Sequence, residues 1–316
     1  MNVVALAGGV GGAKLAHGLA LVLNPGDLTV VVNTGDDFEL FGLNISPDLD
    51  TVCYTLAGLN NLYSGWGREG ETWKAIENVM RLGGPGWFHL GDQDLGTHLE
   101  RTRRLKAGQM LSQVTKEFCS AWGITQRVLP MSDQPVRTVV ITEEYGPIPF
   151  QNYFVEFQCQ PRVRGFRFDG IEEAVPAPEV LEAIERAGLV VICPSNPWVS
   201  IHPILAVPGM RAAIEEKTVI AVSPLISGKA VKGPAAKMYQ ELGITPSAEA
   251  VARHYGSLLA GFVLDSEDRG LCEAIQQSGI IPLAAKTMMN SVEDRKRLAD
   301  DIIHFWGDLH RRAVTL

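Results

Sequence analysis

The sequence predicts an α/β protein with a Rossmann-like three-layer core, a parallel sheet and a smaller inserted or capping region. Three observations support this prediction. An apolar run over residues 3–7 is followed by a glycine-rich turn and a helical pattern. Further β-branched runs alternate with helix-like stretches late in the chain. The middle of the chain instead carries alternating and aromatic stretches, which are typical of antiparallel hairpins.

The first unit is predicted to be strand, glycine turn, helix and strand. After the glycine turn, Leu15, Leu19 and Val22 repeat at helical spacing. Residues 28–32 are a β-branched run that suits a buried parallel strand. Later strands are expected over 189–193 and 218–222, preceded by helices over 178–187 and 209–216. This alternation indicates a doubly wound sheet.

The central portion is expected to cap the sheet. Residues 51–122 are expected to be mainly helical, and residues 136–168, including the aromatic stretch 153–157, to form antiparallel hairpins. We therefore expect a single unit over 1–316, with the Rossmann-like core over about 1–60 and 178–316 and the insertion over about 61–177.

Composition excludes several classes of protein. With 46% hydrophobic and 20% charged residues, the 316-residue chain is too apolar to be mainly disordered. A net charge of -8 argues against general nucleic-acid binding. No apolar run approaches the ~20 residues of a membrane span. The five cysteines are scattered without a Cys-x-x-Cys pair, so we expect reduced thiols in a cytoplasmic protein.

The glycine loop is the first candidate site. Gly8, Gly9, Gly11 and Gly12 let backbone N–H groups approach a phosphate at a helix N-terminus, and Lys14 follows them. The loop lacks the Gly-Lys-Ser/Thr of a Walker loop and the spacing of a strict dinucleotide fingerprint. We favour nucleotide binding over the alternative of a tight strand-to-helix turn.

Acidic residues follow the second strand. Asp36, Asp37, Asp48 and Asp50 stand at or soon after its carboxyl end, where open α/β sheets bind ligands. Clustered carboxylates with phosphate oxygens suit Mg²⁺. The alternative is that Asp48 or Asp50 caps a helix that begins near Thr51. We favour the cap for Asp48 and a functional role for Asp36 and Asp50.

A helix is expected to begin near Asp92. Asp94 and His98, four residues apart, would then share one face. N-capping by Asp92 with a surface Asp–His pair and contact with a ligand are equally good interpretations. The basic residues that follow are expected to form a solvated face: Arg101, Arg103, Arg104 and Lys106.

Two polar loops follow the late strands. Ser195 and Asn196 can donate to a phosphate or a base, and Lys229 and Lys232 can neutralise a diphosphate. Pro-flanked Ser and Asn residues are also ordinary turn formers. The functional interpretation depends on these loops converging with the glycine loop.

Taken together, these segments resemble the 2-phospho-L-lactate transferase (CofD-like) family of deazaflavin coenzyme biosynthesis. The segments that carry the resemblance occur in order at 8–14, 32–37, 46–51, 90–94, 129–133, 194–197 and 223–224. The resemblance implies a Rossmann-like enzyme that joins a phosphorylated three-carbon acid to the deazaflavin FO. The donor would be a guanosine diphosphate adduct of 2-phospho-L-lactate, phosphoenolpyruvate or 3-phosphoglycerate, and GMP would be released.

The resemblance also implies roles for residues. Asp50 is expected to contact FO, with further contacts from His89, Asp92 and Gln93, although a basic residue is frequent in the family where Gln93 stands. The glycine loop, Asn33, Ser195 and Asn196 are expected to face the guanosine diphosphate. We hypothesise that Asp36 or Asp37 together with Asp50 holds Mg²⁺, and that one of these carboxylates orients or deprotonates the FO hydroxyl.

Other interpretations stay open. Trp66, Trp73 or Trp87 can stack on the flat deazaflavin or belong to the core. We expect a homodimer that acts on small-molecule substrates. A nucleotide-sugar-binding regulatory protein of the same fold is the alternative, and a dehydrogenase is disfavoured by the imperfect fingerprint.

Overall fold

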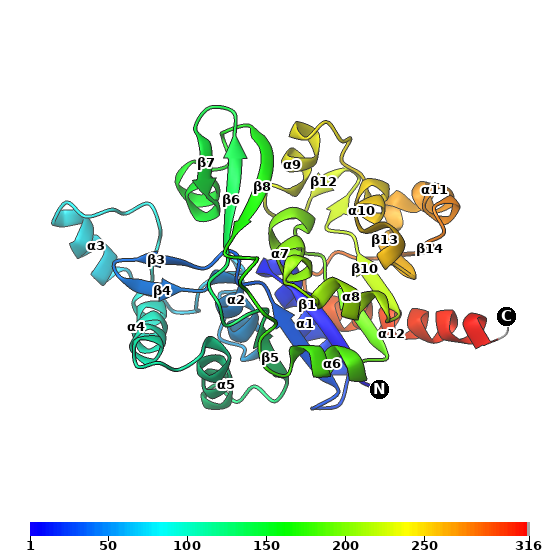
Figure 1. Cartoon of the computed structure of the whole chain (residues 1–316), viewed down its shortest axis with the longest axis horizontal. Helices are drawn as coiled ribbons and strands as arrows, with labels where there is room; N and C mark the ends of the chain where they lie inside the picture. Colours follow the sequence, from blue (N-terminus) through cyan, green and yellow to red (C-terminus); the bar gives the residue numbers. More distant parts are fainter. Residues whose placement is uncertain (315–316) are drawn as a thin grey trace.

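A seven-stranded parallel sheet forms the centre of the computed structural model, which describes residues 1–314 and the side chains up to residue 311 (Figure 1). All its neighbouring strands pair in parallel. The winding direction reverses between β1 and β9, which defines the switch point of a doubly wound sheet. Across the sheet the strands are β14 (Ile281–Ala285), β13 (Gly261–Asp265), β10 (Val219–Val222), β9 (Leu189–Ile192), β1 (Val3–Ala7), β2 (Leu28–Val32) and β5 (Arg127–Pro130).

Helices cover both faces of this sheet. Because side chains alternate along a strand, Val3 and Ala5 of β1 pack on one face, and Val4 and Leu6 on the other. The first face carries α1 (Gly9–Val22), α2 (Pro47–Leu56), α5 (Leu111–Ala121) and α12 (Val292–Val314). The second carries α6 (Val180–Arg186), α7 (His202–Ala206), α8 (Met210–Glu215), α9 (Ala235–Glu241), α10 (Ala248–Tyr255) and α11 (Cys272–Gln277). The predicted three-layer core is confirmed.

Smaller elements stand outside the three layers. Figure 1 shows the antiparallel sheet β7-β6-β8 above the central sheet, with α3 at one end of the molecule and α12 at the other. The segment 61–177, which we expected as an insertion, also contributes β5 to the central sheet. The smaller elements are β3 (Phe38–Leu40), β4 (Leu43–Ile45), α3 (Lys74–Arg81), α4 (Asp92–Lys106), β6 (Arg137–Thr142), β7 (Gly146–Pro149), β8 (Val163–Asp169), β11 (Leu225–Ile226) and β12 (Lys229–Ala230).

The prediction of a strand over residues 153–157 is wrong. A π-helical turn spans Asn152–Glu156, and the N–H of Phe157 donates to the carbonyl of Asn152 at 2.8 Å. The aromatic residues pack in this compact turn, because Tyr153 is buried and Phe154 stacks on Phe150 at 5.5 Å. The predicted antiparallel pairing is confirmed for β6 with β7 and β8.

All five cysteines are free thiols, and three of them are buried. Within residues 1–314, no helix combines the length and the apolar character needed to cross a membrane.

Candidate active site

The glycine loop and the loop after β9 meet at the switch point of the sheet. The hydroxyl of Ser195 accepts a hydrogen bond from the N–H of Gly8 at 3.1 Å and donates to the carbonyl of Gly8 at 2.8 Å. A Cβ atom on Gly11 would lie 2.3 Å from the carbonyl oxygen of Pro194, so only glycine allows this approach. The predicted convergence of the two loops is confirmed at the place where such sheets bind ligands.

Asp48 joins the second strand's loop to the glycine loop. Its carboxylate accepts from the N–H of Gly9 at 2.7 Å and from the amide of Asn33 at 2.9 Å. The prediction that Asp48 caps its own helix is wrong, because Ser46 is the N-cap of α2 and Asp48 lies in the first turn. Asp48 instead accepts a hydrogen bond from a backbone N–H group at the N-terminus of α1, where its negative charge is favourable. Asn33 also donates to the carbonyl of Val199 at 3.2 Å.

A cluster of buried carboxylates lies beside this junction. Asp36, Asp37, Asp48 and Asp50 are each less than a tenth exposed. Burial raises the pKa of Asp37 to about 7, although the Arg137 guanidinium opposes the rise. Burial and the neighbouring Asp48 raise the pKa of Asp36 well above its usual range, and burial raises that of Asp48 to about 6. One carboxylate oxygen of Asp36 and one of Asp37 has no hydrogen-bond partner among the described residues.

Arg101 occupies the centre of a second polar group. The prediction that it lies on a solvated face is wrong, because its side chain is buried and donates to both carboxylate oxygens of Asp50, at 3.0 Å from Nη1 and also from Nη2. Nη1 lies 3.1 Å from Nδ1 of His98, which therefore accepts the hydrogen bond. Nε2 of His98 faces Asp94 at 3.4 Å. Asp94, His98 and Arg101 lie at positions i, i+4 and i+7 of α4, so they share one face of this helix. The spacing alone does not show that this face of the helix is buried.

The buried carboxylates around Asp36 and the polar group around Arg101 differ in their suitability for a metal ion. Asp50, Asp94 and His98 bring their ligand atoms within 4.8 Å of one another. Arg101, however, already supplies a positive charge to this group. Asp36 and Asp37 combine unpartnered oxygens with raised pKa values, which a bound cation would lower. Hard oxygen donors of this kind fit Mg²⁺.

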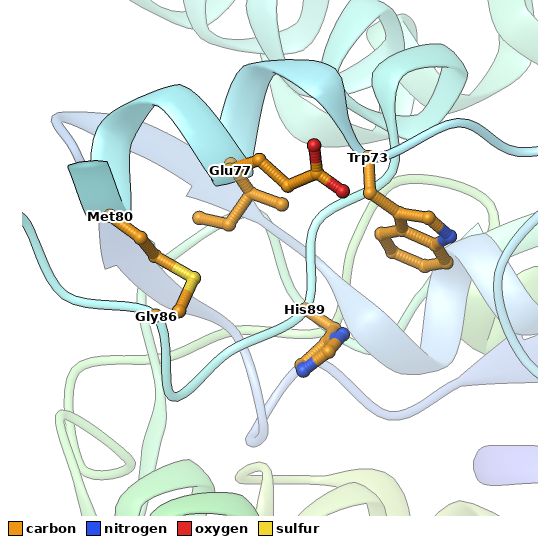
Figure 2. Close-up of a pocket in the computed structure, with 6 residues that line it drawn as sticks. Trp73, Glu77, Met80, Gly86 and His89 are labelled. Carbon is orange, nitrogen blue, oxygen red and sulfur yellow. The ribbon is translucent and has the colours of Figure 1, made fainter.

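His89, one of the four residues expected to contact FO, lines a pocket on the α3 side of the molecule, whereas Asp50, Asp92 and Gln93 are not among its lining residues. A cavity of about 220 Å³ is lined by Trp73, Ile76, Glu77, Met80, Gly86 and His89. Figure 2 shows the rings of Trp73 and His89 at one end of it and Met80 and Gly86 at the other, and the two ring centroids lie 5.6 Å apart.

Asp92 and Gln93 hold the chain around this pocket together. The carboxylate of Asp92 accepts from the N–H groups of Lys74 at 3.2 Å and Ala75 at 3.0 Å, and so caps α3, whereas Gly91 is the N-cap of α4. The interpretation of Asp92 as the cap of its own helix, one of the two that the sequence left open, is therefore wrong. The side-chain amide of Gln93 donates to the carbonyl of Gly70 at 2.9 Å.

The other predicted residues are distributed around the glycine loop. Lys14 donates to the carbonyl of Met289 at 2.8 Å, and Lys232 donates to the carbonyl of Ser64. Lys229 is exposed on β12. Asn196 accepts from the N–H of Trp198 at 3.0 Å.

Two of the three tryptophans named above do not line the pocket. The ring of Trp87 contacts those of Phe38 and Phe88 in a small apolar cluster, which favours a packing role. Trp66 is 48% exposed.

Comparison with known proteins supplies the family. The family model described as 2-phospho-L-lactate transferase CofD matches residues 3–294. This chain belongs to the CofD family. It is therefore a transferase of coenzyme F-420 biosynthesis, and the CofD resemblance of its glycine, aspartate and Pro-Ser-Asn-Pro segments is confirmed.

Curated relatives match nearly the whole chain. A phosphoenolpyruvate transferase of Streptomyces griseus is 46% identical over 306 residues, covering 95% of this chain and 96% of the relative. A phosphoenolpyruvate transferase of Kitasatospora aureofaciens is 44% identical over 307 residues, with 95% and 96% coverage. Among solved structures, a member of the UPF0052 family from Bacillus halodurans superposes with a TM-score of 0.61 at 15% identity, covering 96% of this CofD chain and 98% of its own, which shows the shared fold.

Proposed function

We propose that this protein transfers the phosphoenolpyruvate unit of a guanylylated donor to the deazaflavin FO and releases GMP. The observation that carries the proposal is the junction at the switch point, where the glycine loop meets Ser195 and Asp48 beside buried carboxylates. The names of relatives at 46% and 44% identity favour phosphoenolpyruvate over the other two acids that the sequence left open.

The reaction requires alignment and charge neutralisation more than a covalent enzyme intermediate. The terminal ribityl oxygen of FO forms a bond to the phosphorus that bears the acid. The bond from this phosphorus to the oxygen of GMP breaks, and GMP leaves with that oxygen and its electron pair. The hydroxyl proton passes to a carboxylate. Asp37 suits this role because one of its oxygens has no partner and its pKa of about 7 is close to neutral pH.

Asp36 and Asp50 would hold Mg²⁺, which leaves Asp37 free to accept the proton. The unpartnered oxygen of Asp36 suits such an ion, and each Asp50 oxygen keeps a lone pair beyond the one that Arg101 uses. When bound, Mg²⁺ would neutralise the negative charge of the diphosphate. The dipole of α1 favours the same negative charge at the N-terminus of the helix, where the N–H of Gly9 already donates to Asp48.

The pocket between Trp73 and His89 suits the flat rings of FO. Its walls are mainly apolar, and the two rings offer faces and edges for stacking. Helix α4 links the pocket region to Asp50, because Asp92 at its start caps α3, which lines the pocket, while Asp94 lies in the group that contains Asp50. FO would place its rings in the pocket and its ribityl chain along α4.

An assay with purified protein tests this function. The three guanylylated acids are offered in competition with FO and Mg²⁺, and products are identified by mass spectrometry. We expect FO-dependent GMP release and the adduct of phosphoenolpyruvate. Asp37→Asn should lower kcat at least a hundredfold, whereas Glu39→Gln, an exposed neighbour on β3, should not. A nucleotide-sugar-binding regulator would release no GMP when FO is added.

A further inference from the structure

Residues 129–133, one of the stretches that carry the family resemblance, lead from β5 toward β6. Polar groups fix this part of the chain at the carboxyl edge of the central sheet. The carboxylate of Asp133 accepts from the N–H of Ser112 at 2.6 Å and from its hydroxyl at 2.8 Å, at the start of α5. The N–H of Met131 donates to the carbonyl of Val32 at 2.8 Å. The chain is thereby held in place as it enters β6.

Strand β6 begins beside the loop that bears Asp36 and Asp37. The N–H of Thr138 donates to the carbonyl of Gly35 at 2.7 Å, and a Cβ atom on Gly35 would lie 2.7 Å from the hydroxyl oxygen of Thr138. The side-chain amide of Gln151 donates to the carbonyl of Asp36 at 3.4 Å. The first residues of β6 are therefore packed directly against the loop of the buried aspartates.

Arg137 precedes Thr138 on β6 and carries a guanidinium that is only partly used. Because side chains alternate along a strand, Arg137 lies on the face of β6 opposite to Thr138, and it is partly exposed. Its Nη1 donates to the carbonyl of Val136 at 2.9 Å. Among the side chains that the structure describes, no carboxylate oxygen lies within 4.0 Å of the nitrogens of Arg137. A guanidinium has five N–H donors, so most of them are available to a ligand.

The positive charge of Arg137 acts on Asp37. Burial raises the pKa of Asp37, and the charges of Arg137 and, to a smaller extent, Arg101 lower it. Asp37 therefore lies near both cations. Arg101 already donates to both carboxylate oxygens of Asp50. Of these two cations, Arg137 is the one that can still bind an anion beside Asp37.

The proposed donor brings a further negative charge to this place. In the proposed reaction, the phosphorus that bears the acid would lie next to Asp37, which accepts the proton of the attacking hydroxyl. In phosphoenolpyruvate and 2-phospholactate the carboxylate is attached to the carbon that carries the phosphate oxygen, whereas in 3-phosphoglycerate it stands one carbon further away. A carboxylate so near to Asp36 and Asp37 would be repelled unless a cation compensated its charge. An arginine suits this task, because its planar guanidinium binds a carboxylate through two parallel hydrogen bonds.

We propose that Arg137 binds the carboxylate of the transferred acid and so favours donors that carry this group on the phosphate-bearing carbon. The inference rests on the proposed function, because the acid is the group which that reaction transfers. Arg137 is a binding residue in this role, and it neither gives nor takes a proton. Residues 129–133 contribute by fixing the point at which β6 begins.

Isothermal titration calorimetry of the full chain tests the contact, without FO and at constant Mg²⁺. Three probes are titrated: the guanylylated 2-phospholactate, its analogue with a neutral carboxamide in place of the carboxylate, and the guanylylated 3-phosphoglycerate. The wild type should bind the first probe at least about tenfold more tightly than the other two, as expected for hydrogen bonds between charged groups. Arg137→Gln should bind all three with similar affinity. Arg167→Gln is the matched control and should keep the wild-type preference, because Arg167 is exposed on β8 and pairs with Asp169.

The preference among the probes separates recognition from a general effect on the fold. Equal binding of the three probes by the wild type would overturn the proposal, as would binding of none of them. An Arg137→Gln variant that binds every probe more weakly but keeps the wild-type preference would also overturn it. Thermal melts show whether Arg137→Gln folds; if it does not, Arg137→Lys decides, because loss of the two-pronged donor should still reduce the preference. FO-dependent GMP release by the wild type is measured separately, so failure of the proposed function is distinguishable from failure of this contact.

Discussion

Arg101 on α4 holds Asp50 on α2 through both carboxylate oxygens, 51 residues apart in the chain. This pair joins a helix of the segment 61–177 to α2, the helix that bears Asp48 and Asp50. Because the guanidinium and the carboxylate are both buried, each would lose its charge partner if the other were removed. Asp50 therefore has a structural role besides the role in binding that we propose for it.

Replacing Arg101 should destabilise the protein strongly. Arg101→Met leaves the Asp50 carboxylate buried without its partner, which we expect to lower the free energy of unfolding by about 3–5 kcal/mol. Urea denaturation measures this. Asp50→Asn combined with Arg101→Met should cost less than the sum of the two single changes. Arg103→Met, which removes an exposed pair with Glu100, should have little effect; equal losses from Arg101→Met and Arg103→Met would contradict the burial argument.

The buried aspartates should make stability depend on pH. The pKa of Asp37 is about 7 in the folded protein and 3.8 in the unfolded chain. Between these values the folded state holds a proton that the unfolded state has lost. The free energy of unfolding should therefore fall as pH rises from about 4 to about 7, by on the order of 4 kcal/mol at most from this group. Asp37→Asn should make the fall shallower; an unchanged slope would show that Asp37 ionises normally.

Mg²⁺ should stabilise the protein more at alkaline than at acidic pH. At about pH 8 Asp37 and Asp48 are mainly ionised and concentrate negative charge around Asp36, whereas at about pH 5 Asp37 keeps its proton. Differential scanning calorimetry should show a larger rise in Tm on adding Mg²⁺ at the higher pH. Asp36→Asn should reduce this rise. A rise in this variant that equals the rise in the wild type would place the ion elsewhere.

Replacing glycine by alanine should have opposite effects on stability at a crowded position and at an open position in a helix. Gly11→Ala places a Cβ atom 2.3 Å from the carbonyl oxygen of Pro194, so we expect a loss of about 1–3 kcal/mol and weaker nucleotide binding. Gly96 in α4 has open space around its Cβ position. Gly96→Ala should therefore stabilise the protein by about 0.5–1 kcal/mol. Thermal denaturation of both variants checks the opposite signs.

Trp73 should determine the affinity for FO. Trp73→Ala removes one wall of the pocket with His89, and we expect KM for FO to rise about tenfold with little change in kcat. Trp66→Ala serves as the control, because Trp66 does not line the pocket. Steady-state kinetics with FO as the varied substrate compares them. A larger KM effect from Trp66→Ala would move the FO site to the loop that carries Trp66.

The core of this fold was predictable because its signals are local. The runs over 3–7 and 28–32 became strands with those same bounds, since unbroken β-branched and apolar sequence suits strands buried on both faces. The glycine loop was recognisable for the same reason, since the backbone geometry of a strand-to-helix turn depends on neighbouring residues. The aromatic stretch 153–157 was misjudged because a short alternating pattern also suits a compact turn packed on Phe150.

By itself, the sequence determined the layers of the core, the glycine loop and the family. Tertiary structure alone decided the partners of charged side chains. Asp48 lies in a segment typical of a helix start, yet its carboxylate accepts a hydrogen bond from the N–H of Gly9 at the N-terminus of α1, 39 residues earlier. Arg101 belongs to a basic run that suits a solvated face, yet it is buried against Asp50. Periodicity shows which side chains share a face of a helix, but the burial of that face depends on what distant segments place against it.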